Sequence, residues 1–591
     1  MITHSLSKNT GLISLAALLV FASGCGRPAG HALPEPPRVV TCEPGKAGGR
    51  LVLVTDGVPK TFNPIFAIDG GSQSVTRLLF SALVQFDMVT QEPQPGLAES
   101  WSVEADQKTW TFKLRKGLRW SDGLPITADD LLFTWNDLVY NPEFDRFTHE
   151  LLRFEGKPFT VTKVDDLTVR VVTPEVIAPF LQFISAAPVL PKHILARELR
   201  TKNFLNAYSL NANPKTIVGS GPFRLKDARA GKVILLERNP EYYAVDKAGT
   251  RLPYLAEVQM NVAPDAGMAP FFFFQNQSDV CESVKPDVRS QFEAAFTKRS
   301  GRFVDVGTGV ECNYFWFNQN TNVDASGKPM VSPARLKLFR DRKFRQAVSC
   351  AIDRERMVKE IYGGRAQPVL SLISADNPRW NNPNVPLFGH DPAKARALLA
   401  EIGVRDRNGD GVLDDAEGNP VEFSIISNSD NAPRSRTAAM IQEDLNKLGF
   451  KVEFRPVTFQ MIIQKITTTF DYDSAIIGLG GGGADPATHL NILRSSEPLH
   501  QWFPQQQTPS TDWEARIDFL MDAQLHTLDA AARKKSFDEV QAIWAEELPM
   551  IPIAAPNVSA AVRGDLANLR PVSATQYHVT WNIEELYLKA K

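Results

Sequence analysis

The stretch LAESWSVEADQKTWTFKLRKGLRWSDGLPITADDLLFTWNDL, residues 97–138, carries the clearest local pattern in the chain. Apolar and polar side chains alternate over residues 110–114, which predicts a half-buried strand because successive side chains of a strand point to opposite faces. Residues 121–123, Ser-Asp-Gly, predict a turn. Thr127 and Asp130 then form a capping-box pattern ahead of apolar residues at helical spacing. The stretch therefore predicts a strand, a turn and a capped helix.

A second segment predicts a β-α-β unit. Residues 423–425 and 452–454 read as two short strands. Between them, Ala439 and Leu445 lie on the apolar face of a predicted helix, and Gly449 ends that helix. Such a unit is expected in an α/β lobe.

Further short motifs follow in a fixed order along the chain. They are Ala98-Glu99-Ser100-Trp101, Ser121-Asp122-Gly123, Gly219-Ser220-Gly221-Pro222-Phe223, Arg238-Asn239-Pro240-Glu241-Tyr242-Tyr243 and Ala351-Ile352-Asp353-Arg354. Together they resemble the signature of the bacterial extracellular solute-binding proteins of family 5, the oligopeptide, dipeptide and nickel receptors of ABC importers. The resemblance covers about residues 50–591, so it is to a whole receptor and not to one module.

The resemblance implies an α/β fold of the periplasmic-binding-protein-like type, class II, in which two main lobes close on a cleft and an extra lobe is added. The implied division is a lipoprotein signal peptide at 1–24, a tether at 25–48, lobe I at 49–85, 212–310 and 558–591, lobe II at 86–211, and lobe III at 311–557. Ligand is expected between lobes I and III, and the protein is expected to be a monomer.

The N-terminus predicts export and anchoring. Residues 11–22 form an apolar run, shorter than the roughly 20 residues that a permanent membrane helix needs. Residues 22–25, Ala-Ser-Gly-Cys, resemble the bacterial lipobox, which implies lipidation of Cys25 and a periplasmic protein anchored to a membrane of the cell envelope. The alternative is an ordinary signal peptide in which Cys25 is incidental. Residues 26–49 are rich in Pro, Gly and Ala and predict a tether.

Composition and missing motifs exclude several functions. The net charge is −2, from 65 basic and 67 acidic side chains without blocks of one sign, so no nucleic-acid partner is predicted. Neither HExxH nor G-x-S-x-G occurs, and the nine histidines are scattered, so the chain is not predicted to be an enzyme. The four cysteines after Cys25 show no CxxC spacing, and the sequence does not decide whether they pair.

A glycine run at residues 478–483 follows a predicted strand. Its GxGxxG match does not predict a nucleotide site, because Pro486 interrupts an immediate helix and no Lys-Ser/Thr completes a phosphate loop. In the resembled family this position carries Trp-x-x-Asp-x-x-Asp-Pro and lines the cleft. Asp485 fits the end of that motif, whereas Gly482 takes the place of the acid that pairs with a peptide's α-ammonium. The predicted ligand contacts here are Gly480, Gly481, Gly482, Gly483 and Asp485; the alternative is a flexible bend that lines nothing.

Residues 313–318 stand where the family has a strand that crosses into lobe III. Alternation puts Tyr314, Trp316 and Asn318 on one face of this strand. We expect that face, and not the opposite one, to look into the cleft and contact the ligand.

Residues 406–417, DRNGDGVLDDAE, resemble a calcium-binding loop, with Gly411 at the sharp turn. The predicted ligands are the side chains of Asp406, Asn408, Asp410, Asp414 and Glu417 and the carbonyl of Val412. A helix precedes the loop and a strand follows it, so a structural calcium ion is predicted and a sensor is not. The alternative is a pair of ordinary Asn-Gly and Asp-Gly turns.

These observations predict the substrate-binding lipoprotein of an ABC importer. It would capture a peptide or similar small solute in an interlobe cleft and deliver it to a membrane permease that works with an ATPase subunit. No cofactor is predicted to be required, and the loop at residues 406–417 is a candidate site for a structural calcium ion. The alternative is an exported hydrolase, or an adhesion or sensing protein that reuses the receptor fold, and the solute itself is not specified by the sequence.

Overall fold

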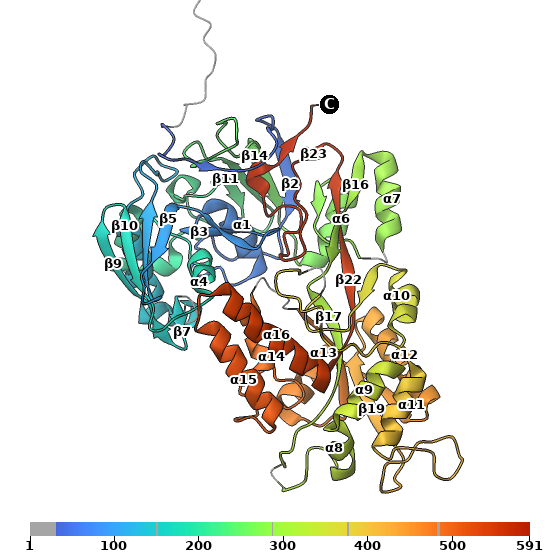
Figure 1. Cartoon of the computed structure of the whole chain (residues 1–591). Helices are drawn as coiled ribbons and strands as arrows, with labels where there is room; N and C mark the ends of the chain where they lie inside the picture. The colour runs from blue at the N-terminus through green and yellow to red at the C-terminus, as the bar shows by residue number, and fades with distance from the viewer. Residues whose placement is uncertain are drawn as a thin grey trace, which may run out of the picture.

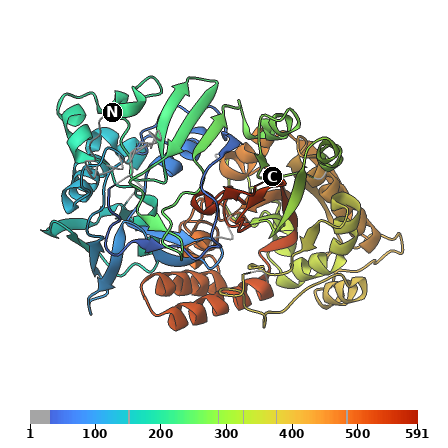
Figure 2. The same cartoon turned by 90° about the horizontal axis from the view of Figure 1, so that it is seen from above.

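The chain is an α/β protein built on three large sheets (Figure 1). The computed structural model describes residues 31–148, 152–285, 288–324, 326–374, 377–480 and 485–590. Cys25, Gly481, Gly482 and Gly483 lie outside the described residues. Seen from above, the blue-to-teal and the yellow-to-orange parts of the chain lie on opposite sides, with the red C-terminal segment between them (Figure 2).

The stretch at residues 97–138 folds as predicted. The strands β5 (Ala98–Val103) and β6 (Thr109–Leu114) pair antiparallel, and the capping box of Thr127 and Asp130 begins α2 (Ala128–Leu132). The sheet is completed by β10 (Thr168–Val172) and β9 (Thr160–Asp165), in the order β5-β6-β10-β9. Around it lie a π-helical turn (Phe133–Val139), α3 (Asp145–Thr148), α4 (Phe180–Ala186) and α5 (Lys192–Arg200).

The second sheet has the order β11-β12-β14-β2 and packs beside the first. Its strands are β11 (Phe223–Arg229), β12 (Val233–Arg238), β14 (Glu257–Asn261) and β2 (Arg50–Val54), with α1 (Gly70–Leu79) beside them. Phe112 of β6 and Leu236 of β12 belong to one continuous cluster of buried apolar side chains. Predicted lobes I and II therefore share a core.

Smaller strand pairs complete this half of the molecule. They are β1 (Arg38–Val39) with β13 (Ala244–Val245), β3 (Val84–Asp87) with β4 (Glu92–Pro95), β7 (Arg153–Phe154) with β8 (Lys157–Pro158), and β23 (Leu566–Ala567) with β24 (Tyr587–Leu588).

The third sheet has eight strands and extends through both halves of the molecule. Its main path is β15-β22-β17-β21-β19-β20, and β16 and β18 also pair with β22. The strands are β15 (Val280–Cys281), β16 (Gly301–Thr308), β17 (Glu311–Phe317), β18 (Ala366–Pro368), β19 (Glu422–Asn428), β20 (Lys451–Val457), β21 (Ser474–Gly480) and β22 (Met550–Arg563). Strand β22 pairs with β17 through its first residues and with β16 and β15 through its last ones. The predicted boundary between residues 557 and 558 falls inside β22, and the predicted lobe boundaries stay predictions.

Helices surround the third sheet. They are α6 (Ala269–Phe274), α7 (Arg289–Lys298), α8 (Pro333–Phe339), α9 (Arg342–Ala351), α10 (Arg354–Tyr362), α11 (Pro392–Glu401), α12 (Ala432–Leu448), α13 (Phe459–Gln464), α14 (Leu490–Leu493), α15 (Asp512–Leu525) and α16 (Ala530–Glu547). The predicted β-α-β unit is β19-α12-β20, whose strands pair parallel. Gly449 ends α12 with φ of 115°, a left-handed conformation that a side chain would strain.

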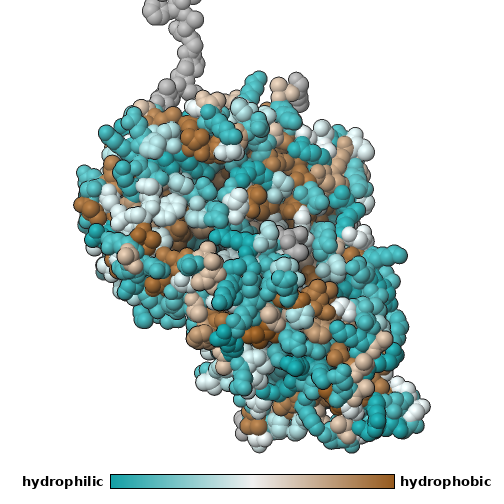
Figure 3. All heavy atoms as spheres, in the orientation of Figure 1, coloured by the Kyte–Doolittle hydropathy of each residue, from teal (hydrophilic) through white to brown (hydrophobic). Residues whose placement is uncertain are grey.

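Figure 3 shows hydrophilic residues intermixed with scattered hydrophobic ones on this face. Among the described residues, no helix combines the length and apolar character needed to cross a membrane. Cys42, Cys281, Cys312 and Cys350 are all free thiols.

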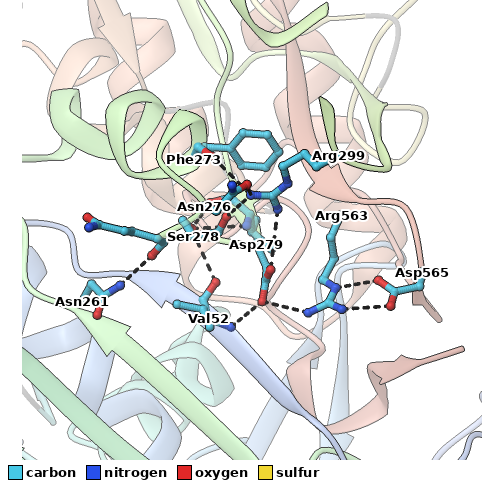
Figure 4. Close-up of polar contacts among 11 residues, drawn as sticks. Val52, Asn261, Phe273, Asn276, Ser278, Asp279, Arg299, Arg563 and Asp565 are labelled. Carbon is cyan, nitrogen blue, oxygen red and sulfur yellow. Dashed lines mark hydrogen bonds and ion pairs between the residues drawn. The ribbon is translucent and has the colours of Figure 1, made fainter. Parts of the chain in front are cut away.

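Asp279 joins the second sheet to the third. Its carboxylate accepts a hydrogen bond from Val52 N of β2 at 2.8 Å and one from Arg563 of β22 at 3.2 Å (Figure 4). Its backbone bonds to the same two residues, since Asp279 N donates to Val52 O and Arg563 N donates to Asp279 O. Arg299 lies 3.6 Å from the other carboxylate oxygen, and Asp565 holds the far side of Arg563. One carboxylate thus connects two sheets.

We expect Asp279→Asn to lower the free energy of unfolding by about 1–3 kcal/mol, because the largely buried carboxylate is the charged acceptor for Val52 N and Arg563. Urea denaturation measures the change. Asp227→Asn, at an exposed carboxylate of β11, is the matched control and should be within about 0.5 kcal/mol of the wild type. Equal losses in the two variants would contradict the role given to Asp279.

Candidate ligand-binding site

Two segments cross between the halves of the molecule side by side. Strand β16 passes into β17 through Gly309, and β22 passes alongside through Pro556. Gly309 N donates to Pro556 O at 2.9 Å, and a Cβ on Gly309 would lie only 2.9 Å from that oxygen. Gly307 has φ of 95°, at an irregularity in the pairing of β16 with β22. The close approach at Gly309 and the left-handed backbone at Gly307 explain why glycine occupies both positions.

A small pocket of about 120 Å³ lies beside this crossing. It is assembled from several parts of the chain: the crossing segment, the hairpin of β3 and β4, the glycine end of β21, helix α16, and the C-terminal segment. The lining residues that bear on its chemistry are Gln91, Thr308, Gly309, Val310, Cys312, Tyr314, Leu372, Leu479, Gly480, His489, Trp544 and Ser573. The pocket therefore lies where the predicted lobes meet.

A larger cavity of about 1180 Å³ adjoins the small pocket, with which it shares Gln91 and Ala574. Charged side chains line it, and several of them are paired: Arg38 with Glu584 at 2.5 Å, and Arg570 with Asp87. The two hollows differ in character, because none of the described residues that line the small pocket is Asp, Glu, Lys or Arg.

The three ligand contacts predicted in and just after β17 are buried to different depths. Tyr314 lines the small pocket. Trp316 is fully buried in an apolar cluster, and its indole N–H donates to the hydroxyl of Tyr472 at 3.3 Å. Asn318 is also fully buried and donates to the carbonyls of Phe470 and Tyr472. Alternation places Tyr314 and Trp316 on one face, as predicted, but only Tyr314 is among the residues of this pocket.

The glycine segment contributes Gly480 to the pocket, and Gly481, Gly482 and Gly483 lie outside the described residues. At Gly478, at the other end, a Cβ would meet the flexible ends of two side chains, 2.0 Å from Glu311 Oε1 and 2.2 Å from Arg434 Nη2. These two side chains form an ion pair at 2.6 Å across β21.

Asp485 forms an ion pair within predicted lobe III. Arg533 of α16 donates to its two carboxylate oxygens at 2.6 and 2.8 Å, and both side chains are buried. The Asp485 carboxylate also accepts from Ala487 N. Because its charge is balanced within the lobe and it does not line the small pocket, Asp485 is placed to hold the turn after the glycine run and not to bind a cationic group in this pocket.

Tyr314 and Gly480 are the predicted ligand contacts among the described lining residues, and His489 and Trp544 are among those that were not predicted. His489 lies in the 3₁₀ turn Pro486–His489, shortly after the glycine run. Trp544 comes from α16, whose helical pattern alone does not reveal that the indole reaches a pocket. Helix α16 lies far along the chain from β17 and the glycine run, so no local pattern connects them.

The predicted calcium ligands are used in other ways in the structure. The Asp406 carboxylate accepts from the N–H groups of Gly409 and Gly411, and these bonds lower its pKa. Asn408 and Asp410 accept from backbone N–H groups two residues on, and Glu417 pairs with Lys337 of α8.

The remaining carboxylate, Asp414, accepts weakly from Arg407 N at 3.4 Å. In the part of the chain that the structure describes, no three His, Cys, Asp or Glu side chains are grouped to hold a metal ion. Calcium binding at this loop, including the Val412 carbonyl, stays a prediction.

The fold places a small pocket beside two segments that cross between the halves of the molecule. Residues 92–500 match the family described as bacterial extracellular solute-binding proteins, family 5, middle region, and the chain belongs to this family. The predicted family is therefore confirmed, and with it the class of the fold. Members of this family are periplasmic or extracellular binding proteins and not enzymes.

The chain is similar to proteins of known description over most of its length. A probable ABC transporter-binding protein of Deinococcus radiodurans is 29% identical, over 84% of this chain and 85% of that protein. The oligopeptide-binding protein AppA of Bacillus subtilis is 26% identical, over 98% of this chain and 99% of AppA. The solved structure of AppA in complex with a nonapeptide matches 93% of this chain and 100% of the AppA chain, with a TM-score of 0.61.

The calcium-loop pattern predicts that millimolar calcium raises the melting temperature of the protein relative to EGTA. An ion that binds only the native state increases the free energy of unfolding, by about 2.7 kcal/mol at a hundredfold excess over Kd. Glu417→Ala should remove the rise, since the bidentate ligand is lost. Coincident wild-type melting curves in EGTA and calcium would contradict the prediction and leave ordinary turns at residues 406–417.

Proposed function

We propose that this protein is the solute receptor of an ABC importer, which captures a peptide or similar small solute between its lobes and delivers it to a membrane permease. The single observation that carries the proposal is the position of the small pocket: it lies against Gly309, at the point where two segments cross between the lobes, in a chain of the solute-binding family. A solute held there contacts both halves and favours their closure.

Two ion pairs that join predicted lobes II and III support closure. Arg379 pairs with Glu92 of β4 at 2.8 Å and donates to Gln91 O at 3.2 Å. His526, just after α15, lies 3.1 Å from the carboxylate of Glu175. Each pair is partly exposed, and such pairs contribute about 0–1 kcal/mol. Together they hold two lobes in contact weakly enough that solute release needs little energy.

The peptide class is supported by the relatives. AppA is described as an oligopeptide-binding protein, and it aligns with this chain from end to end. The combined hollows extend from a charged cavity to an uncharged pocket, and a peptide carries both kinds of group. Peptides are therefore the class of solute that we assign to this receptor.

The test is native mass spectrometry of the protein purified from its own cell envelope. We expect a bound solute whose masses form a peptide ladder, and the freed protein should bind the same peptides in calorimetry. Retention of a single non-peptide mass would replace the peptide class. A preparation that is empty and binds no member of a peptide library would overturn the proposal.

We also propose that lipidation of Cys25 anchors the receptor, as the lipobox pattern indicates. Cys25→Ser should move the protein from the membrane to the soluble fraction, because an acyl chain and not a helix would hold it there. Cys42→Ser is the matched control, since Cys42 is a half-buried thiol beside Tyr254, and this variant should stay with the membrane. A membrane-bound Cys25→Ser protein would contradict the anchor.

A further inference from the structure

His489 and Trp544, which both line the small pocket, each have a buried polar atom without a hydrogen-bond partner in the described part of the chain. His489 is 6% exposed and Trp544 is 1% exposed, so both side chains are more than nine-tenths buried. Neither His489 Nε2 nor Trp544 Nε1 has a partner among the described residues. An unpaired buried polar atom costs about 1–3 kcal/mol, and native proteins seldom leave two of them in one pocket.

The described residues that line the pocket are uncharged and combine apolar side chains with neutral polar ones such as Gln91 and Thr308. The described residues that line the pocket include Leu372, Ile373, Leu479, Ile492 and Met550, and none of them is Asp, Glu, Lys or Arg. The nearby Asp485 carboxylate is already paired with Arg533. Burying an unpaired ammonium or carboxylate group in such a pocket costs several kcal/mol.

His489 is itself neutral at physiological pH. Burial lowers its pKa to about 4, against the smaller opposing effect of the Asp485 charge. The neutral imidazole has one N–H and one bare nitrogen, whereas the Trp544 indole only donates. A group that satisfies both side chains must accept from Trp544, and it must offer either a donor or an acceptor to His489 Nε2.

We propose that this pocket recognises an uncharged group of the solute, an amide or a hydroxyl with an apolar flank, through Trp544 Nε1–H and His489 Nε2. This inference rests on the proposed function and specifies its chemistry at one subsite. An amide carries a carbonyl acceptor and N–H donors, and a hydroxyl carries both on one oxygen. The pocket thus selects a neutral side chain, a blocked end or an internal peptide unit, and it rejects a free α-ammonium group.

The volume is consistent with one such group. About 120 Å³ corresponds to roughly four water molecules at about 30 Å³ each, which is the size of one side chain and not of a whole peptide. The rest of a longer solute would extend into the adjoining larger cavity, which shares Gln91 and Ala574 with the pocket.

The probes that test the pocket are isovaleramide, isovalerate and isobutylammonium, which combine similar apolar bodies with neutral, negative and positive heads. Binding to the full mature chain, freed of solute, is measured by ligand-observed NMR titration. We expect isovaleramide to bind in the millimolar range and each charged probe at least about 10-fold more weakly, the ratio that corresponds to about 1.4 kcal/mol.

Variants assign the binding to the two side chains. Trp544→Phe keeps an aromatic ring and removes the N–H donor, and His489→Phe removes the ring nitrogens. Each variant should bind isovaleramide about 10-fold more weakly and should show a smaller preference for the neutral probe over the charged ones. Trp513→Phe, at an indole of α15 that does not line the pocket, is the control and should bind as the wild type does. Thermal melting of each variant confirms that it is folded.

The outcomes of these binding experiments test the inference separately from the proposed receptor function. Equal binding of the charged probes, unchanged binding by both folded variants, or no binding of isovaleramide by the wild type would each overturn the inference, and in the last case water alone fills the pocket. The solute retained from the cell envelope tests the receptor function independently, because it does not depend on which group occupies this subsite.

Discussion

The structure depends on one strand that belongs to two lobes. Strand β22 runs without interruption for 14 residues. Its backbone N–H and C=O groups must be paired, and they are paired with β17 at one end and with β15 and β16 at the other. The lobes therefore cannot separate without breaking a sheet, and their relative position is limited to what a continuous strand allows. Asp279 extends this constraint to the second sheet, because it bonds Val52 and Arg563 at once.

The pairing of β22 is irregular at two places between the lobes. The register of β22 shifts against β16 near Gly307 and against β17 near Tyr314, and the stretch between the two shifts includes Gly309. Pairing on either side is regular, so this stretch is where small changes of φ and ψ would turn one lobe against the other with the least loss of pairing. The exposed ion pairs between the lobes, such as Arg379 with Glu92, are weak enough to break during opening. A continuous strand and weak ion pairs between the lobes together suit a receptor that must both close on its solute and release it.

Local structure was predictable where the pattern is short-range. Alternation and the capping box predicted β6 and α2, and the apolar spacing before Gly449 predicted α12, because each pattern is decided within a few residues. The site was predictable only in part. Alternation gave the face of Tyr314 and Trp316 but not their depth, which is set by neighbouring strands and by Tyr472. The side chains of Asp485 and Arg533 are 48 positions apart in the sequence, so nothing local indicates that they neutralise each other.

None of the described residues that line the small pocket carries a charge. Its walls come from segments that meet only in the folded protein, and the charges that lie near it are already paired: Asp485 with Arg533 inside the lobe, and Arg379 with Glu92 between the lobes. The polar atoms left over, on His489 and Trp544, weaken the empty protein and gain a partner when a solute enters. Binding energy is then available at the place where the lobes meet, so the group that satisfies these atoms also stabilises closure. Recognition and closure thus depend on the same few contacts beside β22.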